Sequence, residues 1–141
     1  MHNTEGRQAC IFLSTHSFEP EIVPVQGEDI LAVIRKMIGC EWVEVVRTRR
    51  LGNKYIMIVD EDGFQKNHPV FNEIGSYLYG IEQHGQPIVG DAVIIRIERD
   101  PDGSEGFEWL NPEEAEILTN TIRIGLRQFV YQLRQKEGKP Q

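Results

Sequence analysis

The segment from Asn111 to about Lys136 constrains the fold most, because it predicts one long helix with two apolar sides. Asn111 can cap the helix, Pro112 suits its first turn, and Glu113 and Glu114 place negative charge where the helix dipole favours it. One apolar set recurs every three or four residues and can pack on a sheet: Ala115, Leu118, Ile122, Leu126, Phe129 and Leu133. A second set recurs every seven residues on another side: Ile117, Ile124 and Tyr131.

The second apolar set predicts a partner for this helix. The surface helix of a monomer needs to bury one face, so apolar residues on two sides predict burial on two sides. We expect a second copy of the chain to cover Ile117, Ile124 and Tyr131, in a homodimer or a higher homo-oligomer. Gly125 lies between the two sets and would let a partner backbone approach closely. The alternatives are a helix that bends into a groove of its own domain and one that frays after Gly125.

The rest of the chain predicts a mainly antiparallel sheet. Strands are expected over residues 8–14, 18–25, 42–48, 54–60, 91–98 and 107–110. Pro20 and Pro24 lack a backbone N–H, so the second strand is expected at a sheet edge. In the strand at 91–98, one face is expected to carry Val93, Ile95 and Ile97.

Two short helices are expected between these strands. The first begins after Gly27 and ends at Gly39. The second has Pro69 in its first turn, after Asn67 or His68 as its cap. It is expected to end at Gly80 and to bury an apolar face made of Val70, Phe71, Ile74, Tyr77 and Leu78. The chain is therefore predicted to be one α+β domain over residues 1–141, with two short helices and a long C-terminal helix over 111–136.

Composition limits the class of protein. The chain has 141 residues, of which 40% are hydrophobic and 26% charged, as in a globular domain. No apolar run approaches the roughly 20 residues that cross a bilayer, and residues 1–7 lack the apolar core of a secretory signal. Cys10 and Cys40 are expected to be buried, reduced thiols, with a structural disulfide as the alternative. We therefore expect a cytoplasmic protein that does not enter the membrane.

A basic hairpin stands out in an otherwise acidic chain. The net charge of −7 argues against nucleic-acid binding over the whole surface, but leaves a local contact open. Four cations lie within eight residues around the predicted hairpin turn: Arg47, Arg49, Arg50 and Lys54. Guanidinium groups that converge around a turn can hold a phosphate, so this hairpin is predicted to bind an anionic small molecule or a nucleotide. The alternative is a solvated turn whose cations pair with neighbouring carboxylates.

No residue pattern predicts a catalytic, metal or cofactor site. The nucleophile-elbow, P-loop and dinucleotide-binding motifs are missing from the sequence. The acidic stretches at 60–63 and 100–105 lack the spacing of a calcium loop and are expected to be turns. Five aromatic residues offer stacking faces for a base, but their spacing favours the core: Tyr55, Tyr77, Tyr79, Phe107 and Trp109.

The four histidines also lack metal-ligand spacing, and they are expected on the surface. His84 with Glu82, or His68 with Glu73, could form an acid–base pair in space. Such a pair is the basis of the enzyme alternative, in which dispersed carboxylates and a histidine meet in a cleft.

Turn and strand signatures in the middle of the chain follow a recognisable order: Ile38-Gly39, Trp42–Arg47, Ile58–Gly63, Asn67 with Pro69, and Ile88–Ile94. Over residues 18–97 this order resembles an uncharacterised family of small domains from bacterial phages, plasmids and other mobile elements. The resemblance implies a compact α+β fold and a mobile-element origin, and it supplies no catalytic residues. The helix after Asn111 lies outside the matched region.

The expected function is that of a non-enzymatic binding protein of a phage or mobile element. It would bind an anionic ligand or a host protein, for example in counter-defence by sequestering a nucleotide signal. The alternatives are the small enzyme with a dispersed site and a structural or regulatory accessory protein that has only protein partners.

Overall fold

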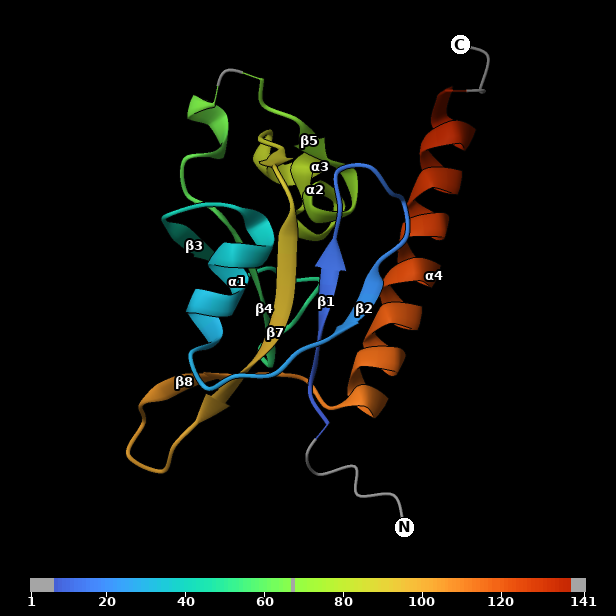
Figure 1. The fold of residues 1–141 in the computed structure, drawn as a ribbon. Helices are drawn as coiled ribbons and strands as arrows, with labels where there is room; N and C mark the ends of the chain where they lie inside the picture. The colour runs from blue at the N-terminus through green and yellow to red at the C-terminus, as the bar shows by residue number, and fades with distance from the viewer. Residues whose placement is uncertain (1–6, 67, 138–141) are drawn as a thin grey trace.

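A computed structural model of the chain describes residues 7–66 and 68–137, and they form the predicted α+β fold (Figure 1). The described strands of the main antiparallel sheet are β1 (Ala9–Leu13), β2 (Glu21–Pro24), β3 (Val43–Val46), β4 (Tyr55–Asp60), β7 (Ala92–Arg99) and β8 (Glu105–Glu108). They lie in the order β2-β1-β7-β4-β3, with β8 paired to β7. The remaining elements are α1 (Ile30–Ile38), η2 (Gly63–Gln65), β5 (Phe71–Asn72), α2 (Glu73–Tyr79), α3 (Ile81–His84), β6 (Ile88–Val89) and α4 (Pro112–Glu137).

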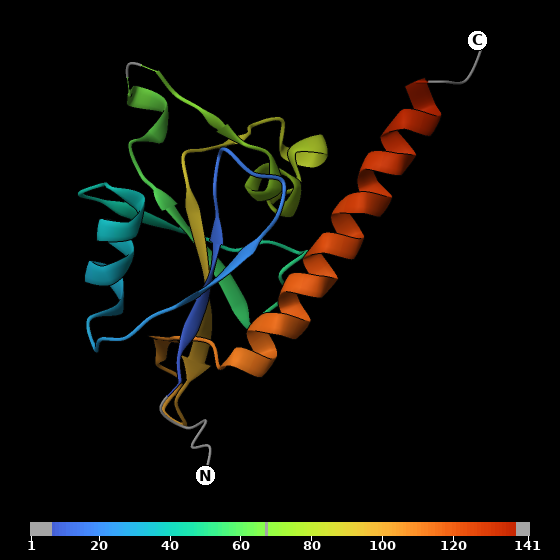
Figure 2. The ribbon, with the colours of Figure 1, turned by 45° about the vertical axis from the view of Figure 1, so that its right-hand side comes forward.

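Helices cover both faces of the sheet, and β7 at its centre supplies both apolar layers. Alternate residues of a strand point to opposite faces. Ile94 packs in the layer that α2 and α4 close, whereas Val93, Ile95 and Ile97 pack in the layer that α1 closes with Ile34. Figures 1 and 2 show α1 and α4 on opposite sides of the sheet. The predicted alternation in this strand is confirmed.

The second predicted strand lies at a sheet edge, as its prolines indicated. Within the described residues β2 pairs with β1 alone, over Ala9↔Pro24 to Phe12↔Glu21. It is shorter than the predicted 18–25. The hairpin of β3 and β4 is also confirmed, with a longer connection over residues 47–54.

The prediction that Pro69 begins a helix is wrong. The chain is extended through β5, which pairs with β6, and α2 begins only at Glu73. Val70 and Phe71 are consequently 47% and 56% exposed rather than buried. Asn67, one of the two predicted caps of this helix, lies outside the described residues. The end of the helix at Gly80 is confirmed, since Gly80 has a left-handed conformation with φ of 87°.

Asn72 explains where α2 starts. Its side-chain oxygen accepts a hydrogen bond from the Gly75 N–H at 2.8 Å, which caps the helix. Its amide nitrogen donates to the carbonyl oxygens of Leu13 at 2.8 Å and Gly90 at 2.9 Å. Buried polar groups need such partners, and these lie far from Asn72 in the sequence. The contacts of Asn72 therefore combine a local helix cap with tertiary hydrogen bonds.

The long helix α4 begins as the local sequence predicts. Asn111 Oδ1 accepts from the Glu114 N–H at 2.8 Å, and Glu114 Oε1 accepts from the Asn111 N–H at 2.9 Å. The helix continues to Glu137 without fraying after Gly125. One face of its first half packs on the sheet, whereas Leu133 of the predicted sheet-facing set is 42% exposed. Figure 2 shows the C-terminal end of the helix extending away from the rest of the chain.

Candidate functional site

The basic loop over residues 47–54 carries the four cations that the sequence singles out, and it separates them. Three of them have carboxylate partners: Arg47 with Glu105 at 3.4 Å, Arg50 with Glu82 at 2.7 Å, and Lys54 with Glu114 at 3.7 Å. Within the described chain, Arg49 is the one of the four that has no ion-pair partner. The cations therefore do not converge on one point, and anion binding by this loop stays a prediction.

Arg50 has the contacts of a structural residue. Its Nη1 donates to the Tyr77 carbonyl oxygen at 2.6 Å, so it ties the loop to α2. Its guanidinium carbon lies 4.4 Å from the Tyr77 ring centroid and 5.2 Å from that of Phe129 on α4. The hydrogen bond from Arg50 also lowers the pKa of Glu82 from its ordinary value. Arg50 thus joins three elements rather than facing a ligand.

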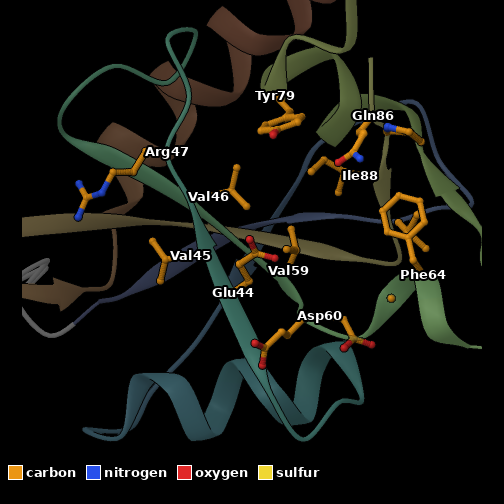
Figure 3. A pocket seen from close by; sticks show the side chains of 14 residues that line it. Glu44, Val45, Val46, Arg47, Val59, Asp60, Phe64, Tyr79, Gln86 and Ile88 are labelled. Atoms are coloured by element: carbon orange, nitrogen blue, oxygen red, sulfur yellow. The ribbon is translucent and has the colours of Figure 1, made fainter. Parts of the chain in front are cut away.

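A pocket of about 270 Å³ lies beside this loop, at the β3 end of the sheet (Figure 3). Val46 of β3, Val59 of β4 and Ile88 of β6 are buried apolar residues that line it. Phe64 of η2 and Tyr79 of α2 contribute aromatic rings. In Figure 3 the Arg47 guanidinium points away from both rings.

Most of the charged side chains that line this pocket are acidic. Its lining includes three carboxylates, from Glu44, Asp60 and Glu61, and one cation, Arg47. Asp60 pairs with Lys66 at 2.8 Å. Across residues 7–66 and 68–137, the Glu44 and Glu61 carboxylates have no ion-pair partner. The pocket therefore favours a cationic rather than an anionic occupant.

The sequence interpretation missed this pocket. Two of its walls depend on η2, which places Phe64, and on the pairing of β5 with β6, which places Ile88. Neither of these elements was predicted. The one usable signal was Phe64, an aromatic residue directly after an acidic turn.

Neither of the two possible acid–base pairs is hydrogen-bonded in the described residues. The Glu82 carboxylate bonds to Arg50, and the His84 ring stacks on Tyr79 with 4.7 Å between centroids. In the part of the chain that the structure describes, His68 and Glu73 share no hydrogen bond, and no cluster of three or more metal-ligating side chains is found. His2 lies outside the described residues.

The acidic stretches are turns, as expected. Asp60 Oδ1 accepts from the Asp62 N–H at 2.9 Å, and Asp102 Oδ1 accepts from the Ser104 N–H at 2.9 Å.

The expected core position of the five aromatic residues is confirmed. Trp109 is buried, and the others pack half-buried against the two apolar layers. Both cysteines are free thiols, but Cys40 is only half-buried.

The second apolar set of α4 lies on the side away from the sheet. Ile117, Ile124 and Tyr131 are 68%, 57% and 63% exposed. The space beside Gly125 is occupied by its own chain, contrary to expectation. A Cβ atom at Gly125 would lie 2.5 Å from the Tyr77 hydroxyl, so the side chain that approaches it closely belongs to α2 of the same chain. Cover by a second copy stays a prediction.

No family model, curated protein or solved structure matches the chain. The resemblance of residues 18–97 to the mobile-element family therefore stays a prediction. Among the described residues, none of the helices is both long and apolar enough to cross a membrane.

Proposed function

We propose that this chain is a non-enzymatic binding protein of a phage or other mobile element, and that it acts on a protein partner in the cytoplasm as a homodimer. The observation that carries the homodimer is the exposed stripe of α4, formed by Ile117, Ile124 and Tyr131. Exposed apolar residues that recur along the solvent side of a helix favour burial against a partner. The basic loop favours a protein partner over an anionic ligand, because Arg47, Arg50 and Lys54 already neutralise carboxylates of the same chain.

The spacing of the stripe favours an antiparallel pair of α4 helices. Ile117 and Tyr131 each lie seven residues from Ile124. A two-fold axis at Ile124 sets that residue against its own copy and sets Ile117 against Tyr131 of the second copy. Such a self-complementary contact is the usual form of a homodimer interface.

The charges of α4 favour the same direction. Among its exposed residues, the first three turns are acidic through Glu113 and Glu116, and the rest is mainly basic through Arg127, Arg134 and Lys136. A parallel pair would bring like charges together, whereas an antiparallel pair brings opposite charges together. Glu113 precedes Ile117 by four residues, and Arg134 follows Tyr131 by three. In the antiparallel pair, Glu113 of one copy would therefore lie beside Arg134 of the other.

Light scattering at micromolar concentration tests the dimer. The unmodified chain should have the mass of a dimer, and Ile124→Glu should be a monomer because it buries two like charges at the axis. Gln132→Glu is the matched control, since it adds the same charge to an exposed position of α4 outside the stripe, and it should remain a dimer. A monomeric unmodified chain, or a dimer that survives Ile124→Glu, would contradict the proposal.

A charge swap tests the direction of the pair. Glu113→Arg and Arg134→Glu should each weaken the dimer, and the double variant should restore it, because only an antiparallel pair brings the two positions together.

Heating the same purified samples tests the kind of partner. A nucleotide released in stoichiometric amount would contradict a protein partner and would favour the basic loop.

A further inference from the structure

The outer edge of β3 is open within the described chain. β3 is the last strand of the sheet and pairs with β4 alone, over Val43↔Asp60 to Val46↔Met57. The Glu61 N–H donates to the Trp42 carbonyl oxygen at 3.0 Å, which makes these two residues a hydrogen-bonded pair. Such pairs alternate along an antiparallel ladder, so the backbone N–H and C=O groups of Val43 and Val45 point outward.

The β2 and β3 edges of the sheet differ in their protection. Sheets commonly block an edge with proline, charge or a covering element. The β2 edge has Pro20 and Pro24, and the Glu19 carboxylate beside it bonds to Arg123 of α4 at 2.6 Å. The β3 edge has one charged residue in the strand, Glu44, and is otherwise formed by valines. The β3 edge therefore lacks the prolines that block the β2 edge, and it can accept another strand.

The acidic pocket lies on one face of this edge. Glu44 and Val46 line it from β3, and Val59 and Ile88 give it an apolar floor. Its volume of about 270 Å³ is below the range of roughly 300–1,000 Å³ of small-molecule sites, and it suits a single side chain. A strand added to β3 projects every second side chain onto this face.

We propose that the open edge of β3 binds an extended segment of the partner protein as an added strand. An aliphatic side chain of that segment fills the pocket, and a neighbouring Lys or Arg pairs with Glu44 or Glu61. Main-chain hydrogen bonds supply affinity in this mode, and the pocket supplies specificity. The charge follows from the two carboxylates that have no ion-pair partner in the described residues. The inference rests on the proposed function in one respect, namely that the partner is a protein.

A library of random short peptides displayed on phage and selected on the unmodified protein tests this site. The enriched peptides should alternate apolar with other residues and should carry Lys or Arg. Val45→Pro should weaken their binding by about tenfold or more, because it removes an outward N–H without removing a bond to β4. Val45→Thr keeps that N–H and is the matched control, so it should bind like the unmodified protein.

Two further variants test the pocket and its charge. Phe64→Ala removes a wall residue that is 57% exposed, so the fold should persist while affinity falls. Glu44→Lys should reject the selected peptides and should accept versions in which glutamate replaces their basic residues. Acidic consensus peptides, an absence of enrichment, or equal binding by Val45→Pro would overturn the inference.

The experiment separates this site from the dimer. Ile124→Glu lies on α4, away from β3, so it should bind the selected peptides with unchanged affinity per chain. If the unmodified chain is dimeric but no peptide is enriched, the β3 site fails and the α4 dimer stands. If Val45→Pro changes the mass of the protein, the edge pairs with a second copy, which would also overturn the inference.

Discussion

The two neighbouring arginines of the basic loop differ in role despite their equal charge. Arg50 bonds to Glu82 and to the Tyr77 carbonyl oxygen, and its guanidinium packs over the Tyr77 ring. Arg49 is exposed and makes no ion pair among the described residues. The cluster of charge in the sequence therefore contains one residue that holds the fold together and one that is free to meet a partner.

This difference predicts different costs in stability. Arg50→Ala should lower the free energy of unfolding by about 1–3 kcal/mol, because it removes a hydrogen bond to a backbone carbonyl and a cation–π contact. Arg49→Ala should change it by less than about 0.5 kcal/mol. Urea denaturation followed by circular dichroism measures both values. Equal effects of the two substitutions would contradict the structural role of Arg50.

At the scale of elements, the contact between α2 and α4 explains a glycine inside a helix. Glycine in a helix costs roughly 1 kcal/mol relative to alanine. At Gly125 the space beside the helix is taken by the Tyr77 hydroxyl, 2.5 Å from where a Cβ would lie. Tyr77 has little room to retreat, because its ring packs against Phe129 at 5.2 Å and against Arg50.

The Gly125→Ala substitution should therefore destabilise the protein, although alanine favours helix. In a Tyr77→Phe background the nearest ring atom is the Cζ, 3.6 Å from the added Cβ, so the same substitution should be stabilising by about 0.5–1 kcal/mol. Thermal unfolding of the two single variants and the double variant measures the coupling. A Gly125→Ala effect of the same sign in both backgrounds would contradict this account.

At the scale of the whole molecule, the layer between the sheet and α1 is closed to solvent. Cys10 of β1 is 0% exposed within it, and burial raises the pKa of its thiol to about 12. Cys40, after α1, is half-buried, and burial with the nearby Asp60 raises its pKa as well. Cys10 is therefore withheld from solvent, whereas Cys40 is partly accessible.

Thiol labelling at neutral pH should separate them. Cys40 should react with Ellman's reagent in the folded protein. Cys10 should react only when the whole sheet opens, because its raised pKa leaves little thiolate and its burial keeps the reagent out. The labelling rate of Cys10 in a Cys40→Ser variant should rise with urea in step with global unfolding. A Cys10 rate in the native protein equal to that of Cys40 would show that this layer opens locally.

The sequence alone determined the elements whose signals are local. The start of α4 depends on Asn111 and Glu114, three residues apart, and the alternation of β7 lies within one strand. Both were predictable because each contact involves near neighbours in the chain. The edge position of β2 followed in the same way from prolines that lack an N–H.

Only the tertiary structure decided the start of α2, the role of Arg50 and the pocket beside β3. The amide of Asn72 bonds to Leu13 across 59 positions, and the segment after Pro69 pairs as β5 with β6 instead of forming a helix. Arg50 reaches Tyr77 across 27 positions, and the pocket joins β3 and β4 to η2, α2 and β6. Such contacts depend on which segments the fold brings together. Local propensity acts over a few residues and carries no information about that arrangement.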